Sequence, residues 1–138
     1  MIALIIPALN EEVELPICLK SLAAQKNKNF KLIQVDNGST DQTKNIMSNF
    51  AESKRIDTVV LDEPKIGKLN ALRTAIKYIA NDSSIDIIAF SDADSYFSPY
   101  WSEEVQTFFQ ENPNISYGYT TEMLKEDLLK KFRILKKS

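Results

Sequence analysis

The sequence predicts a single α/β domain whose mostly parallel sheet is flanked by helices. Four short and nearly uninterrupted apolar runs alternate with segments in which apolar residues recur at helical spacing. Uninterrupted apolar runs are typical of parallel strands that are covered on both faces. The regular alternation of the two patterns indicates right-handed strand–helix–strand units. The 138 residues are enough for one hydrophobic core and too few for two domains of ordinary size.

The four expected strands are residues 2–6, 31–35, 57–61 and 86–90. The apolar start of the chain lacks a basic leader and is interrupted by Pro7, so we interpret it as a strand and not as a signal peptide. No apolar run approaches the roughly 20 residues that a membrane-spanning helix needs.

Three helices are expected between these strands, over residues 14–25, 41–52 and 67–80. Each carries apolar residues along one stripe, which is the pattern of a helix that packs on a sheet. Pro16 is compatible with the first helix only in its first turn, which places the start near Glu14. Ser39 and Thr40 precede the second helix, and we expect them to cap its N-terminus.

The pattern changes after the fourth strand. Ser98 and Pro99 can open a fourth helix, which we expect to continue to about Glu111. Residues 115–119 predict a fifth, weaker strand. Residues 121–138 carry apolar residues on one stripe and basic residues toward the end, so we expect an amphipathic helix there.

The composition excludes several classes of function. The net charge of −2 gives no sign of nucleic-acid binding. The absence of histidine removes Ser-His and Cys-His catalysis and the usual histidine-ligated metal sites. Cys18 is the single cysteine, which excludes an intrachain disulfide and fits a reducing, cytoplasmic compartment. Aspartate and glutamate are therefore the leading candidates for any acid, base or metal ligand.

Polar clusters follow three of the expected strands. The first strand ends in PALNEE, the second in DNGSTD and the fourth in SDADS. The carboxyl ends of parallel strands lie along one edge of the sheet, where ligands bind in such folds. Asp92 and Asp94 lie two residues apart after a strand, so in extended geometry they face the same way. Two such carboxylates suit Mg or Mn, which favour oxygen ligands and bind in part through substrate phosphates.

Four segments, in this order, resemble the nucleotide-binding half of a family 2 glycosyltransferase of the GT-A fold. They are IIPALNEEVELPICLKSL, VDNGSTDQT, KIGKLNALRTAI and FSDADSYFSPYW, and they extend from residue 5 to residue 101. The resemblance implies a site for a nucleotide-diphospho-sugar donor of UDP, dTDP or GDP type. It also implies a divalent cation, Mg or Mn, and inverting transfer of the sugar to an acceptor hydroxyl.

The resemblance also assigns roles to individual positions. Within its Asp-x-Asp motif we expect Asp94 to meet the cation while Asp92 faces the ribose hydroxyls. The matching positions are Pro7, Ala8, Asn10 and Glu11 in the nucleoside loop, Asp36 and Asn37 near base and ribose, Gly67, Lys68 and Asn70 near base and phosphates, and Asp92, Ala93 and Asp94 at the metal and ribose.

Most of these residues also have a structural interpretation. The paired aspartates can be ordinary loop residues, and DNGST can be a turn in which Gly38 takes a positive φ. Glu11 can favour the positive end of a helix, and Lys68 can be a solvated surface lysine. Asn37 departs from the family, which more often has a second aspartate there. Because an amide donates as well as accepts, Asn37 can still pair with a uracil or thymine ring, and the choice of base stays open.

The resemblance further implies an acceptor-binding half, which we expect to be reduced or missing in a single domain over residues 1–138. In the family that half carries the catalytic base, usually the aspartate of a Glu-Asp pair with an arginine several residues later. Glu126, Asp127 and Arg133 are similar in spacing, so Asp127 is the candidate base. The alternative is a helix face on which these carboxylates pair with lysines four residues further on.

Three functions remain open on the sequence. The first is sugar transfer by a family 2 glycosyltransferase. The second is a non-catalytic nucleotide-sugar-binding module, or the incomplete half of a split enzyme. The third is an α/β signalling domain of receiver type, which has its acidic pair after the first strand and not the fourth. The basic segment 121–138 is expected to contact a missing half, a second subunit or an anionic membrane, at whose inner face the protein would then lie.

Overall fold

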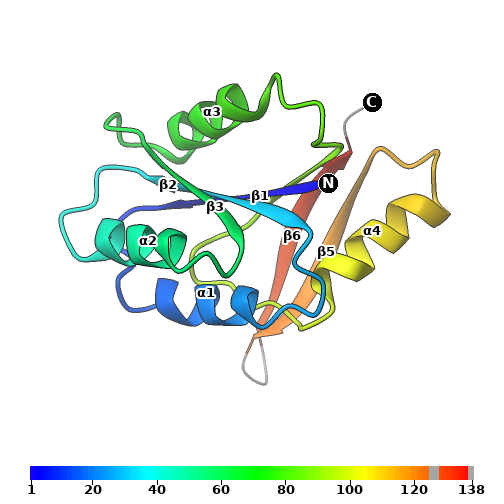
Figure 1. Cartoon of the computed structure of the whole chain (residues 1–138), viewed down its shortest axis with the longest axis horizontal. Coiled ribbons are helices and arrows are strands. Elements are labelled where there is room, and N and C mark those ends of the chain that lie inside the picture. The colour runs from blue at the N-terminus through cyan, green and yellow to red at the C-terminus, as the bar shows by residue number, and fades with distance from the viewer. Residues whose placement is uncertain (125–127, 137–138) are drawn as a thin grey trace.

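The fold is a six-stranded sheet with helices on both faces (Figure 1). The computed structural model describes residues 1–124 and 128–136, with side chains for residues 1–117. The strands are β1 (Ile2–Ala8), β2 (Phe30–Asp36), β3 (Asp57–Asp62), β4 (Ile87–Phe90), β5 (Tyr117–Leu124) and β6 (Leu128–Lys136). The helices are α1 (Leu15–Ala23), α2 (Thr43–Glu52), α3 (Lys68–Ile79) and α4 (Trp101–Glu111).

The four strands expected first form the parallel part of the sheet. Across the sheet the order is β3-β2-β1-β4-β6-β5. β1 pairs with β2 on one side and β4 on the other, so that Ile5 is level with both Ile33 and Phe90. β3 pairs in parallel with β2. This topology confirms the mostly parallel α/β fold that the sequence predicts, with β1 at its centre.

Residues of β1 alternate between two hydrophobic clusters, which explains why its apolar run is uninterrupted. Ile2, Leu4 and Ile6 belong to the cluster on the face of α1, α2 and α4. Ala3 and Ile5 belong to the cluster on the face of α3. In Figure 1 the two faces are seen edge-on, with α3 above the sheet and α1 and α2 below it. Each fully buried large aliphatic side chain contributes about 1.5–3 kcal/mol, so this strand anchors the core.

The four helices predicted before residue 112 are present, with small shifts at their ends. The proline of α1 lies in the first turn, as expected. α4 begins at Trp101, so Pro99 precedes that helix instead of lying in its first turn. The expected cap of α2 is wrong, because Gln42 takes the N-cap position without a side-chain capping bond, and the N–H of Thr43 donates to Asp41 Oδ1 at 2.9 Å. None of the described helices combines the length and apolar character needed to cross a membrane.

The C-terminal segment differs from the prediction. Instead of one helix over residues 121–138, β5 and β6 run antiparallel to each other, and β6 runs antiparallel to β4. A short apolar pattern does not by itself distinguish helix from strand, and the edge of β4 offers backbone groups that a further strand can pair. The membrane or subunit contact expected of that segment stays a prediction, but the helix on which it was based is wrong.

Candidate functional site

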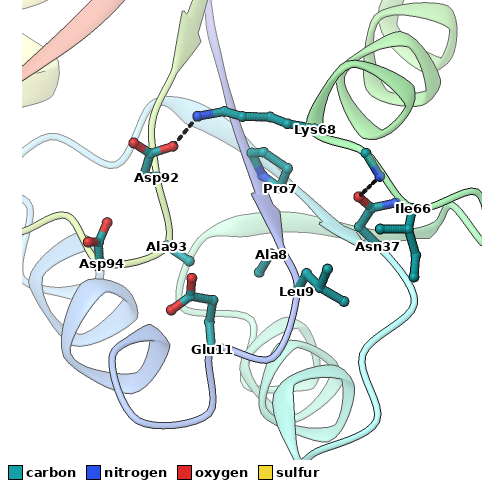
Figure 2. Close-up of a pocket in the computed structure, with 11 residues that line it drawn as sticks. Pro7, Ala8, Leu9, Glu11, Asn37, Ile66, Lys68, Asp92, Ala93 and Asp94 are labelled. Carbon is teal, nitrogen blue, oxygen red and sulfur yellow. Dashed lines mark hydrogen bonds and ion pairs between the residues drawn. The ribbon is translucent and has the colours of Figure 1, made fainter.

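A pocket opens at the carboxyl edge of the parallel strands, where the loops after β1, β2, β3 and β4 meet (Figure 2). Its volume is about 380 Å³, inside the range of roughly 300–1,000 Å³ that small-molecule sites occupy. The residues that line it are Pro7, Ala8, Leu9, Glu11, Asn37, Ile66, Gly67, Lys68, Asp92, Ala93 and Asp94. The polar clusters that are far apart in the sequence therefore do meet at one edge of the sheet.

Some of the residues assigned by resemblance lie elsewhere. Asn10, Asp36 and Asn70 are not part of the pocket lining. Asp127, the candidate base, and Glu126 beside it lie outside the described residues. The pocket thus contains the Asp-x-Asp motif, most of the first loop and the start of α3.

Asn10 ties the loop after β1 to the loop after β2. Its backbone adopts a positive φ of 54°, which asparagine tolerates better than most residues. Its side-chain Oδ1 accepts the N–H of Thr40 at 2.8 Å, and its own N–H donates to Ser39 Oγ at 3.0 Å. The N–H of Glu11 donates to Thr43 Oγ1 at 2.8 Å. Ser39 and Thr40, expected to cap α2, therefore hold the first loop in place instead.

Asp36 and Asn37 lie at the end of β2, and both are buried. Asp36 Oδ1 accepts the N–H of Ser39 at 3.3 Å, which closes the turn after β2. The amide of Asn37 reaches the loop over residues 63–67, between β3 and α3. Asn37 Nδ2 donates to the carbonyls of Glu63 and Lys65, and its Oδ1 accepts the N–H of Gly67, each at 2.9 Å.

Glu63 fixes the same loop from its other side. Its carboxylate accepts the hydroxyl of Thr74 on α3 and, at 2.9 Å, the N–H of Lys65. The hydrogen bond from Thr74 and then the one from the Lys65 N–H lower the pKa of Glu63 below its ordinary value. The loop between β3 and α3 is thus held by the amide of Asn37, which follows β2, and by the carboxylate of its own residue Glu63.

Gly67 and Lys68 place a positively charged side chain, that of Lys68, at the pocket. Gly67 has a φ of 138°, in a region that glycine almost alone occupies, and it is the N-cap of α3. Lys68 is the first residue of the helix, and its ammonium forms an ion pair with the carboxylate of Asp92. Their side chains are 60% and 54% exposed, so the pair is accessible to solvent and contributes little to stability. A competing charged ligand can therefore separate the two side chains at small cost.

The Asp-x-Asp segment is a turn with its carboxylates outward. The N–H of Ser95 donates to the carbonyl of Asp92 at 3.1 Å, and Ser91 Oγ lies 2.8 Å from Ser95 Oγ beneath the turn. Ala93 is buried between the exposed Asp92 and Asp94. In Figure 2, Asp92 extends toward Lys68, and Asp94 lies on the other side of Ala93. Both aspartates are thus exposed on either side of a buried alanine, in a turn and not in the extended geometry expected from the sequence.

The donor set suits a divalent cation that is shared with a ligand. Glu11, Asp92 and Asp94 line the pocket, so it offers carboxylate oxygens and no sulfur or imidazole. Within residues 1–117, whose side chains are described, no group of three or more acidic or sulfur ligands lies close enough to hold a metal by itself. Mg²⁺ usually binds through one or two carboxylates plus substrate phosphates, which is what the Asp92 and Asp94 pair can supply.

Leu9 and Ile66 give the pocket an apolar side that was not predicted from the sequence. Ile66 is 65% exposed and Leu9 is 37% exposed, and both line the pocket together with Pro7. In Figure 2 they lie at the end of the pocket next to Asn37, away from Asp94. Both residues lie inside segments that resemble the family. The motif residues beside them were the only feature of the sequence that could have indicated their place in the pocket.

Comparison with known proteins gives three findings. A family model described as glycosyl transferase family 2 matches residues 3–134. An uncharacterized glycosyltransferase of Haemophilus influenzae is 30% identical over 119 residues, which is 86% of this chain and 38% of that protein. Among solved structures, Staphylococcus aureus TarS 1–349 in complex with UDP has a TM-score of 0.69 and 25% identity, over 80% of this chain and 32% of that one.

A second solved structure, the mannosyltransferase PcManGT from Pyrobaculum calidifontis in complex with GDP-Man and Mn²⁺, has a TM-score of 0.63 and 24% identity. It covers 71% of this chain, which in turn covers 29% of that protein. These likenesses confirm the expected α/β architecture of the GT-A type. The chain spans about a third of the length of each of these three proteins.

Proposed function

This chain belongs to glycosyl transferase family 2, and on that premise we propose that its pocket binds a nucleotide-diphospho-sugar donor. One observation carries the proposal. The pocket combines outward carboxylates, Asp92 and Asp94, with a lysine and an apolar end, at the carboxyl edge of parallel strands. The UDP bound to TarS and the GDP-Man and Mn²⁺ bound to PcManGT support this assignment.

The two ends of the pocket suit the two ends of such a donor. Pro7, Leu9 and Ile66 offer apolar surface to a nucleobase. At the other end Lys68 supplies a positive charge for the diphosphate, and Asp92 and Asp94 supply oxygen ligands for Mg or Mn. A diphosphate can compete with Asp92 for the Lys68 ammonium because the ion pair between Lys68 and Asp92 is exposed to solvent.

The chemistry that we propose is inverting transfer of the sugar to an acceptor hydroxyl. When bound, a divalent cation stabilises the charge that develops on the departing nucleoside diphosphate. Lys68 adds to that stabilisation, and Asp92 and Asp94 would hold the cation. A carboxylate must take the proton of the acceptor hydroxyl, and Asp127 is our candidate for that base. We propose that residues 1–138 act as one donor-binding domain.

Calorimetric titration of UDP, GDP and dTDP, with Mn²⁺ or with EDTA, tests the donor site. We expect tighter binding with Mn²⁺ and loss of that metal dependence in Asp94→Ala. Asp57→Ala is the matched control, because Asp57 is an exposed carboxylate at the start of β3, at the opposite edge of the sheet. Binding by Asp94→Ala at wild-type strength, equal with and without metal, would contradict the assignment.

Donor binding without turnover is a second candidate, because the chain corresponds to 38% of the length of the Haemophilus relative. An assay of nucleotide release with candidate acceptor alcohols separates the two functions. Transfer that disappears in Asp127→Asn, with donor affinity unchanged, would support the complete enzyme and its base. Donor binding with no release above that of the buffer would support the binding module.

A further inference from the structure

The amide of Asn37 is committed to the protein's own backbone. Asn37 is 4% exposed, and both hydrogens of its Nδ2 are donated, one to the carbonyl of Glu63 and one to that of Lys65. Its Oδ1 accepts the N–H of Gly67. A side-chain amide has two donors and two acceptor lone pairs, so only one lone pair of Oδ1 is left for a ligand. The side chain has little capacity to recognise a base directly.

What Asn37 holds is the segment that leads to Lys68. The three backbone groups belong to alternate residues of the 63–67 loop, and the last of them is the N–H of Gly67. Gly67 is the N-cap of α3, and Lys68 follows it directly. The position of the Lys68 ammonium beside Asp92 therefore depends on where the amide of Asn37 holds this loop.

We propose that Asn37 is a positioning residue, which sets the loop over residues 63–67 and through it Lys68, and that it does not select the nucleobase. The inference rests on the proposed donor site and deepens it. It also gives a reason for the asparagine at a position where the family more often has a second aspartate. A carboxylate at Asn37 would have no hydrogen to donate and would face two carbonyl oxygens that now lie 2.9 Å from Nδ2.

Variants of Asn37 should leave the fold intact. The hydrogen bonds of Glu63 with Thr74 and with the Lys65 N–H stay available when the amide is removed. Loss of the Asn37 bonds is therefore expected to loosen residues 63–68 and not to unfold the domain. Hydrogen exchange, followed by mass spectrometry, should show faster exchange at the Gly67 amide in Asn37→Ala, with unchanged exchange in β1.

The test is calorimetric titration of UDP and of GDP, in Mn²⁺, on wild type, Asn37→Asp, Lys68→Gln and the double variant. Asn37→Asp leaves the carbonyls of Glu63 and Lys65 without their donor, and it should weaken the binding of both nucleotides by the same factor, on the order of five- to a hundredfold. Lys68→Gln should cost much less in the Asn37→Asp background than in wild type, because the lysine is then already displaced. Asn45→Asp, an exposed asparagine of α2, is the matched control and should bind both nucleotides as wild type does.

Each outcome decides the inference. Equal losses for UDP and GDP, together with strong coupling between residues 37 and 68, support a positioning role, because a change in stability alone would not couple the two residues. A change of more than about tenfold in the ratio of UDP to GDP affinity would assign Asn37 to base selection and overturn the inference. Independent, multiplicative losses would also overturn it. If the wild type binds neither nucleotide, the proposed function fails and the inference fails with it.

Discussion

Replacing Gly67 by alanine tests how far the donor site depends on one backbone conformation. Gly67 has a φ of 138°, and a Cβ added to it would lie 3.0 Å from Nδ2 of Asn70. A non-glycine residue in such a region costs about 1–3 kcal/mol. The Asn70 side chain can move away only by giving up its 3.3 Å hydrogen bond to the carbonyl of Ile66. Alanine at position 67 therefore costs free energy whether or not the Asn70 side chain moves.

The strain can be relieved in two ways, which two assays distinguish. If the loop stays in place, the free energy of unfolding in urea should fall by about 1–3 kcal/mol, and the melting temperature by roughly 4 °C per kcal/mol. If the loop moves instead, the Asn37–Gly67 hydrogen bond breaks, and the affinity for UDP should fall while stability changes less. Both quantities should be measured on the same preparation of protein.

Gly38→Ala is the comparison variant. Gly38 has a φ of 86°, and a Cβ there would meet Ile66 Cγ1 at 3.5 Å, an ordinary contact. We expect its cost to be near 1–2 kcal/mol, the penalty for a left-handed residue. Unfolding free energy and UDP affinity that both stay at the wild-type value in Gly67→Ala would refute the conclusion that glycine is required at the start of α3.

Two further predictions concern stability. The lowered pKa of Glu63 means that its hydrogen bonds stabilise the fold fully above the ordinary pKa of 4.5, and that this contribution is lost as the pH falls through the lowered pKa. The free energy of unfolding in urea should therefore be lower for Glu63→Gln than for wild type at pH 7, and the difference should shrink as the pH is taken progressively below 4.5. A difference that does not change with pH would count against the assignment. Trp101 is buried against Phe30 and Phe97, with ring centroids 5.8 and 5.0 Å away, so Trp101→Ala should lose about 3–5 kcal/mol of unfolding free energy. Its indole N–H has no hydrogen-bond partner among the described residues, so Trp101→Phe should lose much less, and equal losses for the two variants would show that the N–H contributes.

The parallel part of the sheet and its helices could be predicted because the sequence patterns that determine them are local. Apolar runs and helical stripes are read over a few residues, and each of the first four strands and the helices between them has such a pattern. The start of β5 overlaps the fifth strand predicted over residues 115–119, but its continuation to Leu124 and the whole of β6 could not be predicted in this way. Its segment has apolar residues that also fit a helix, and pairing with β4, which lies over 40 residues earlier in the chain, decides between the two. The strand pairing is a tertiary contact, and the helical stripe contained no sign of it.

The roles of single polar residues were harder to predict for the same reason. Ser39 and Thr40 have the residue types of a helix cap, yet their partners lie in a loop about 30 residues earlier. Asn37 lies in a motif that the family resemblance connects with the base, yet its partners are backbone groups 26–30 residues later. In both cases the residue type fits two roles, and only the packing of one loop on another selects between them.

The asparagines and the pocket carboxylates of the site differ in their hydrogen-bonding chemistry, which gives a reason for that selection. The three asparagines that the resemblance assigned, Asn10, Asn37 and Asn70, each bond backbone groups of neighbouring loops or of their own. Glu11, Asp92 and Asp94 line the pocket, as does Asn37, whereas the carboxylate of Asp36 lies outside the lining and accepts the N–H of Ser39. An amide can satisfy both N–H and C=O groups of a loop, whereas an ionised carboxylate only accepts and is suited to a cation. Loops without regular secondary structure need both donors and acceptors to hold their backbone. The asparagines therefore fix the shape of the pocket together with Asp36 and Glu63, and the charge of its lining comes from Glu11, Asp92, Asp94 and Lys68.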